Sequence, residues 1–89
     1  MYIREMNSGG SGIVNIDISY EELRILTNIL CRSRKQQDFS AKEYELNAEL
    51  IMATTLIGNG FLPPFERELI TNLYDKANEL RKESENNDY

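Results

Sequence analysis

In the segment IVNIDI, residues 13–18, apolar and polar residues alternate from Val14 onward, which places Val14, Ile16 and Ile18 on one face. A period of two with β-branched residues on one face predicts a strand whose apolar face is directed inward. The preceding segment MYIREM suits a partner strand, so we predict a β-hairpin over about residues 2–18. An isolated two-stranded hairpin is marginal in water. We therefore expect this hairpin to lie on the helices or to be completed by a second chain.

Further along the chain, the apolar spacing becomes helical, and two helix starts are clearly marked. Ser19 precedes Glu22 by three residues, and Ser40 precedes Glu43 in the same way, which is the spacing of a capping box. Each cap is also flanked by an apolar pair at the spacing of a hydrophobic staple: Ile18 with Leu23, and Phe39 with Tyr44. Box and staple together predict helices that begin at residues 20 and 41.

The first of these helices, about residues 20–36, is amphipathic. Its apolar side chains fall within about 160° on a wheel of 100° per residue, and they are Leu23, Ile25, Leu26, Ile29 and Leu30. This arc predicts a helix with one buried side. The next helix, about 41–58, is apolar on nearly all sides, and only a narrow stripe is charged: Lys42, Glu45 and Glu49. A helix that is apolar all round is buried all round, so we expect this one at the centre of the fold.

The segment LIGNGFLPPF separates the second helix from the third. Gly60 suits the left-handed position after the helix, where Phe61 could pack back on Leu56, and Gly58 is the alternative. Pro64 suits a first helical turn, because the N–H that it lacks has no intrahelical partner there.

A third helix is predicted over about residues 64–83, where the apolar residues occupy one half of the wheel, and residues 84–89 are expected to be a disordered tail. The elements together predict one small, mainly α domain over residues 1–83. It has an N-terminal β-hairpin followed by a three-helix antiparallel bundle in which the middle helix is central. We expect a homodimer or higher homo-oligomer, because it would cover the middle helix and the hairpin together.

Composition removes several classes of function. The chain has 89 residues, a net charge of −5, no histidine and a single cysteine, Cys31. Structural zinc and Cys-His catalysis are therefore excluded within one chain, and we assign no catalytic, cofactor-binding or metal-ligating residue. The negative charge disfavours nucleic acid as a partner. No apolar run approaches the ~18 residues of a membrane span. A lone cysteine is typical of a reducing compartment, so the expected location is cytoplasmic.

Arg32, Arg34 and Lys35 form the densest positive cluster, in a last helical turn where cations also complement the helix dipole. As a binding site they suit an acidic protein or a small anionic ligand. A DNA-binding helix-turn-helix is disfavoured, because the helix 41–58 would present apolar and acidic side chains to the bases. Cys31 is expected to be a half-buried small hydrophobe.

Two further groups are candidates for partner binding. Tyr44, Phe61 and Phe65 are large side chains assigned to the corner between the second and third helices, and exposed aromatics there would suit docking of another protein. The loop with Ser8, Gly9 and Gly10 fits no phosphate-binding spacing and leads into a strand. A hairpin loop is therefore favoured over a loop that contacts a partner or an anion.

Three functions agree with these features. The favoured one is a small protein-binding module that acts by protein–protein contact, such as an inhibitor, an immunity-like protein or a regulator of a bacterium or phage. The alternative is an oligomer that sequesters an anionic metabolite or a nucleotide. An enzyme that holds a metal with Glu45 and Glu49 is less favoured, because a solvated stripe explains that pair.

Overall fold

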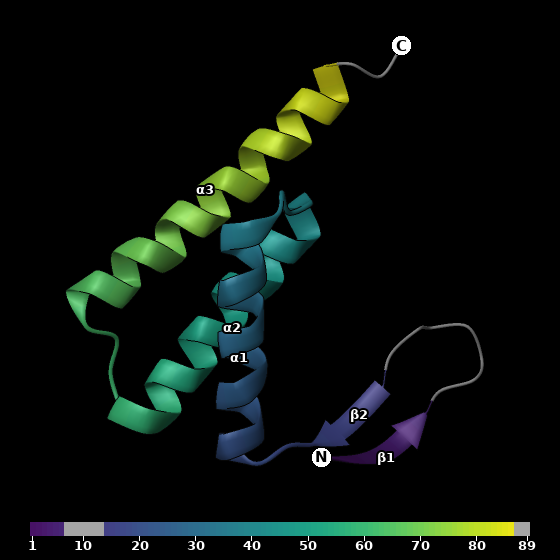
Figure 1. The fold of residues 1–89 in the computed structure, drawn as a ribbon, viewed down its shortest axis with the longest axis vertical. Helices are drawn as coiled ribbons and strands as arrows, with labels where there is room; N and C mark the ends of the chain where they lie inside the picture. The colour runs from purple at the N-terminus through teal and green to yellow at the C-terminus, as the bar shows by residue number, and fades with distance from the viewer. Residues whose placement is uncertain (7–13, 87–89) are drawn as a thin grey trace.

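The computed structural model describes residues 1–6 and 14–86. It confirms the predicted fold class, an antiparallel two-stranded hairpin followed by three helices with the middle helix central (Figure 1). The elements in chain order are β1 (Tyr2–Met6), β2 (Val14–Asp17), α1 (Tyr20–Gln36), α2 (Ala41–Asn59) and α3 (Pro64–Asn86).

Both predicted capping boxes are present. The Ser19 hydroxyl accepts the Glu22 amide at 3.1 Å, and the Glu22 carboxylate accepts the Ser19 amide at 3.0 Å. Ser40 and Glu43 repeat this exchange at 3.2 and 2.9 Å. The second staple forms as well, since the Phe39 and Tyr44 rings lie edge to face with centroids 5.5 Å apart. These local hydrogen bonds fix where α1 and α2 begin.

Gly60 caps the end of helix α2 as predicted, but the position of Phe61 and the length of α3 differ from the prediction. Gly60 has a left-handed backbone with φ +80°, and its amide donates to the Leu56 carbonyl at 2.8 Å. This conformation favours glycine because a Cβ would be strained there. Phe61 does not become buried against Leu56, because 61% of its surface stays exposed. Helix α3 runs to Asn86, three residues beyond the expected end, and residues 87–89 of the predicted tail lie outside the described part.

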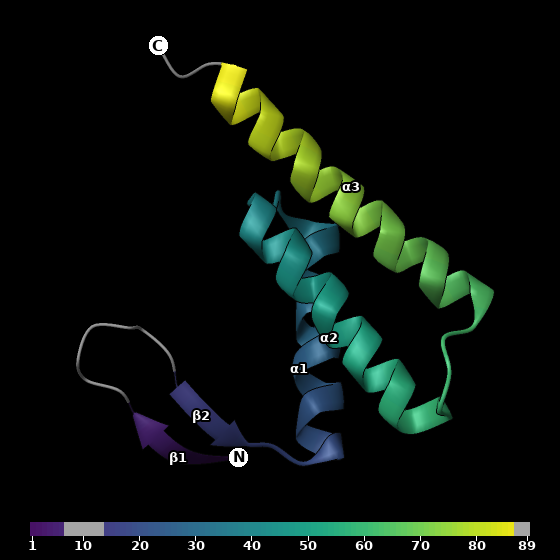
Figure 2. The ribbon, with the colours of Figure 1, turned by 180° about the vertical axis from the view of Figure 1, so that it is seen from behind.

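The apolar core lies between α2 and α3. Its buried members are Ala48 and Ile51 of α2 with Ile70 and Leu73 of α3, and Ala77 of α3 is also fully buried. The alanines remove side-chain bulk where two helices approach closely. Figures 1 and 2 show α3 lying along one side of α2 and α1 crossing the other. Helix α2 is thus the central element.

The bundle is open. Within the described residues, α2 packs against both α1 and α3, whereas the backbones of α1 and α3 do not come together and the two strands pack only on each other. The radius of gyration is 15.1 Å, against about 12 Å for a compact domain of this length. In both ribbon views the hairpin projects from the N-terminal end of α1, away from α3.

The apolar arc of α1 is only partly buried, which contradicts the expected single buried side. Leu23 is buried against α2, but Ile25, Leu26 and Ile29 remain 49%, 40% and 43% exposed. The arc is wider than the strip of α1 that reaches α2. The side of α1 that contacts α2 includes the buried Thr27. Its hydroxyl makes polar contacts with α2, which are described below.

The hairpin has an uncovered apolar face. Ile3 pairs with Ile16 and Met6 with Val14, with an irregularity in register between Ile3 and Glu5. Ile3, Val14 and Ile16 are 50%, 49% and 44% exposed. The alternation therefore predicted the strand correctly, but the described residues of the helices do not cover the face expected to be inward. The first staple residue, Ile18, lies in the connection to α1 and is half-buried.

Stability at acid pH is expected to depend on Glu22. A hydrogen bond from the Met1 ammonium, reinforced by the capping bonds of Ser19, lowers the Glu22 pKa from 4.5 to about 2. Because the folded-state pKa is the lower one, the ionised carboxylate stabilises the fold above about pH 4.5, and this contribution disappears as the pH falls towards 2. Glu22→Gln should lower Tm at pH 7, and the difference from wild type should vanish near pH 2 in thermal melts followed by circular dichroism.

The matched control is Glu21→Gln, which removes a charge from the same helical turn outside the capping box. Its Tm should stay close to wild type at both pH values. If Glu22→Gln still lowered Tm by the same amount at pH 2, the stabilising role of the ionised Glu22 carboxylate would be contradicted.

Candidate partner-binding surfaces

Helix α1 is attached to α2 by hydrogen bonds around a buried amide. Asn47 of α2 has no exposed surface. Arg34 Nη1 donates to Asn47 Oδ1 at 2.6 Å, and Asn47 Nδ2 donates to the Cys31 sulfur at 3.5 Å. Cys31 is a half-buried free thiol, as expected, and packs against the apolar core. A hydrogen bond from a charged donor to a buried acceptor is among the stronger ones in proteins.

Two threonines extend this polar seam. The Thr27 hydroxyl donates to the Leu23 carbonyl of its own helix at 2.8 Å, and it lies 2.8 Å from the Thr54 hydroxyl and 3.4 Å from the Leu50 carbonyl of α2. Thr27 and Arg34 are seven residues apart, so they lie on one edge of α1. That edge is directed at α2 because its polar groups find their partners there.

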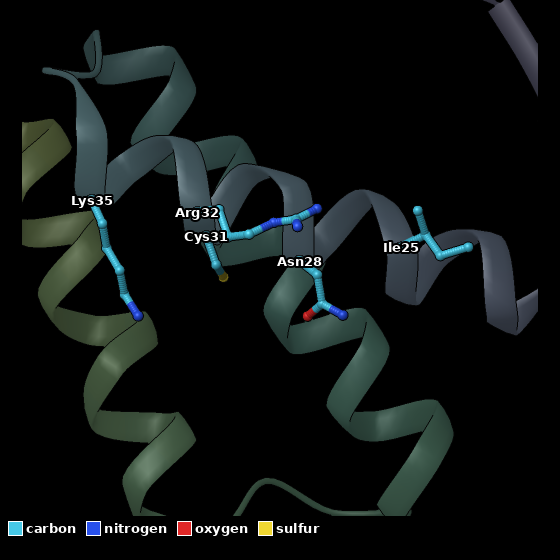
Figure 3. Close-up of a pocket in the computed structure, with 5 residues that line it drawn as sticks. All are labelled: Ile25, Asn28, Cys31, Arg32 and Lys35. Atoms are coloured by element: carbon cyan, nitrogen blue, oxygen red, sulfur yellow. The ribbon is translucent and has the colours of Figure 1, made fainter.

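The basic cluster predicted as one site is divided by this seam. Arg34 turns inward to Asn47, whereas Arg32 and Lys35 line a shallow cavity of about 430 Å³ with Ile25, Asn28 and Cys31 (Figure 3). In this view the Arg32 side chain runs along α1, while the Lys35 side chain points away from it. The two cationic groups do not converge on one point, which is unfavourable for gripping a small anion.

Glu45 is engaged across the α2–α3 interface. Its carboxylate accepts a hydrogen bond from Arg81 of α3 and lies 3.5 Å from the Lys42 ammonium. The bond from Arg81 is the main reason that the Glu45 pKa is lowered. Burial, with the nearby charges of Glu49 and Glu45, raises the pKa of Tyr74. Glu45 thus has structural partners, and no cluster of three metal-ligating side chains is found in residues 1–6 and 14–86.

Four large apolar side chains are exposed in one short segment, residues 56–65, which we call the corner segment. Ile57, Phe61 and Phe65 are 63%, 61% and 74% exposed, and Leu56 is 43% exposed. Phe65 also lines a small cavity of about 210 Å³ with Glu68, Leu69 and Asn72. Phe61 in the α2–α3 connection and Phe65 in the first turn of α3 are therefore both exposed in this segment.

Tyr44 does not belong to the corner segment, contrary to the prediction. It lies in the first turn of α2, packs on Phe39 and is half-buried against the core. At 1.5 Å per residue, it is roughly 20–25 Å from the corner along the helix. Its role in the structure is to fix the entry into α2. The other predicted contact residues, Ser8, Gly9 and Gly10, lie outside the described residues.

A second apolar surface was not identified from the sequence. We define the hairpin–α1 surface as Ile3, Val14 and Ile16 of the hairpin with Ile25, Leu26 and Ile29 of α1, all at least 40% exposed. At the junction of hairpin and helix lies a largely apolar cavity of about 280 Å³, lined by Met1, Ile18, Glu22, Ile25 and Leu26. The alternating strand and the wide apolar arc of α1 indicate such a surface in the sequence, but the sequence analysis expected both to be buried.

Comparisons with protein-family models, with curated proteins and with solved structures each returned no match. In the part of the chain that the structure describes, no helix combines the length and the apolarity needed to cross a bilayer. Evidence on function therefore comes from the surfaces of the molecule.

The polar seam should be energetically coupled. Arg34→Met leaves the Asn47 carbonyl oxygen buried without its donor, which we expect to lower the free energy of unfolding by about 1–3 kcal/mol. Asn47→Leu should also destabilise, and the double variant should recover part of the loss because both polar partners become apolar. A double-mutant cycle in urea is expected to give a coupling of about 1 kcal/mol or more.

The control for this cycle is Arg32→Met. It removes the same charge from an outward position on the same helix and should change stability by less than about 0.5 kcal/mol. Strictly additive losses for Arg34→Met and Asn47→Leu would show that the bond does not hold α1 in place.

Proposed function

We propose that this chain is a small protein-binding module that acts through protein–protein contact at the corner segment, as an inhibitor, immunity-like protein or regulator of a bacterium or phage does. The observation that carries the proposal is the exposure of Ile57, Phe61 and Phe65, each more than 60% accessible within ten residues of sequence. Exposed aromatic and large aliphatic side chains gathered in one place are typical of protein interfaces.

The corner segment is also held in a defined conformation. Gly60 ends α2 in the left-handed conformation, and α3 begins at Pro64, whose φ is fixed by its ring. The Arg67 amide donates to the Pro63 carbonyl at 3.0 Å, and the Arg67 guanidinium donates to the Leu62 carbonyl at 3.3 Å. A surface that is ordered before binding loses less conformational entropy on association.

The chemistry around Phe65 indicates the kind of partner. Glu66 and Glu68 follow this ring in the sequence, and Arg67 between them is engaged with the backbone of the corner segment. The chain as a whole carries a net charge of −5. A partner with an apolar pocket and a basic rim therefore matches this surface, and complementary charge speeds the encounter.

Replacing both aromatic rings should remove partner binding while the fold is retained. In affinity capture from the native host, wild type should retain a stoichiometric partner, and Phe61→Ser/Phe65→Ser should retain at least ~10-fold less, because exposed anchors of this type often contribute more than 1.4 kcal/mol each to binding. The readout is quantitative mass spectrometry of the captured proteins. Since both rings are mostly exposed in the protein, the helix content of the variant should be unchanged.

The matched control is Tyr2→Ser, which removes a ring that is 69% exposed on the hairpin, away from the corner segment. It should capture the partner as wild type does. Equal recovery of the same proteins by wild type and by the double variant would overturn the proposal.

A further inference from the structure

No described helix of the same chain covers the hairpin. Its two strands pack only on each other among the described residues, and Ile3, Val14 and Ile16 are about half exposed. A two-stranded hairpin needs a third strand or a packing partner to be stable in water. The connection to the helices consists of Ile18 and Ser19 together with the ion pair between the Met1 ammonium and Glu22.

Helix α1 presents an apolar stripe next to that hairpin. Ile25, Leu26 and Ile29 lie on the side of α1 that does not reach α2, and two of them line the cavity shared with Met1 and Ile18. Figures 1 and 2 show the hairpin and α1 meeting at a corner on the side of the molecule away from α3. The exposed apolar side chains of the hairpin and of α1 thus lie on neighbouring elements, with a small apolar cavity of about 280 Å³ at their junction.

The charges along α1 favour a second copy of the same helix, in antiparallel orientation. The first turn of α1 is acidic, with Glu21 and Glu22, and its last turns are basic, with Arg32 and Lys35. An antiparallel partner places the acidic end of each helix beside the basic end of the other, whereas a parallel partner places like charges together. Local complementarity matters here, because two chains of net charge −5 otherwise repel each other.

The chain also exposes more surface than a compact monomer of its mass would. The chain exposes 6798 Å², against about 5,400 Å² expected for a compact monomer of this mass. The difference of about 1,400 Å² exceeds the roughly 800 Å² that each partner buries in a standard interface. The projecting hairpin and the uncovered side of α1 account for part of this excess.

We propose that the hairpin–α1 surface is the interface of a two-fold homodimer in which α1 packs antiparallel against α1 of a second copy. With the two-fold axis crossing the outer face of α1 at the height of Thr27, Ile25 of one copy lies opposite Ile29 of the other, and Glu22 lies opposite Arg32. The interface is separate from the corner segment, so the dimer presents two copies of that segment to partners. The two proposals can therefore fail independently.

The first test is the mass of the protein in solution. Light scattering at tens of micromolar should give twice the 10.3 kDa chain mass for wild type and for Phe61→Ser/Phe65→Ser. Leu26→Asp/Ile29→Asp places charges in the apolar centre of the interface and should raise the dimer Kd by at least ~100-fold, which gives a monomer. A monomeric wild type would overturn the proposal and assign the surface to a different protein, and a dimeric aspartate variant would overturn it as well.

A measurement on wild type covers the case in which the aspartate variant does not fold. Hydrogen exchange of the amides at residues 14–17 should slow by at least ~10-fold between nanomolar and tens of micromolar protein, because dimerisation stabilises the hairpin by mass action. Exchange rates that do not depend on concentration would contradict a role for the hairpin in the interface.

The orientation of the helices is tested by cross-linking in a Cys31→Ser background, where the serine hydroxyl still accepts the Asn47 amide. Leu26→Cys lies near the proposed two-fold axis and should form an intermolecular disulfide on mild oxidation. Gln36→Cys should not, because its two copies lie about 27 Å apart along antiparallel helices. Efficient cross-linking at both positions would indicate parallel helices, and a dimer that cross-links at neither would place the interface elsewhere.

Discussion

The side-chain amide of Asn47 is the group on which the arrangement of the helices depends. It is fully buried in α2, and both of its partners, Arg34 and Cys31, come from α1. An unpaired amide in this position would cost about 1–3 kcal/mol. Rotation of α1 about its own axis therefore breaks bonds that no other group replaces, since Thr27 and its contact with Thr54 would be lost together with them.

Because of the Asn47 bonds, α2 contacts its two neighbouring helices in different ways. Between α2 and α3 the contact is apolar, with Ala48, Ile51, Ile70 and Leu73 buried at its centre, and such a contact tolerates small shifts because dispersion and burial are not directional. Between α1 and α2 the contact is directional and fixes the rotation of α1. The apolar stripe of α1 points outward as a consequence, and the hairpin, which precedes α1 in the chain, projects from the N-terminal end of that helix.

The helix starts could be predicted from the sequence because a capping box is local: Ser19 and Glu22 satisfy each other over three residues, whatever the rest of the chain does. Gly60 was predictable for the same reason. The apolar arc of α1 gave the width of its apolar side but not which strip meets α2, because Arg34 and Thr27 decide that through partners 13 and 27 residues away. The bond from Arg34 to Asn47 joins two helices, so the apolar pattern of α1 alone could not reveal it.

Two stabilising interactions compete for the rotation of α1. Burying its apolar stripe against α2 would require one rotation, and hydrogen bonding of the Asn47 amide requires another. Turning α1 to bury Leu26 and Ile29 would gain roughly 1–2 kcal/mol for each half-exposed side chain, which is similar in size to the cost of leaving Asn47 unpaired. Within one protomer the Asn47 bond is formed, and Leu26 and Ile29 stay exposed. A second chain packed against α1, as proposed above, would remove this conflict, since it would cover Leu26 and Ile29 while Arg34 kept its bond to Asn47. The polar seam thus specifies the orientation of α1, and the apolar stripe is the surface that the proposed association would bury.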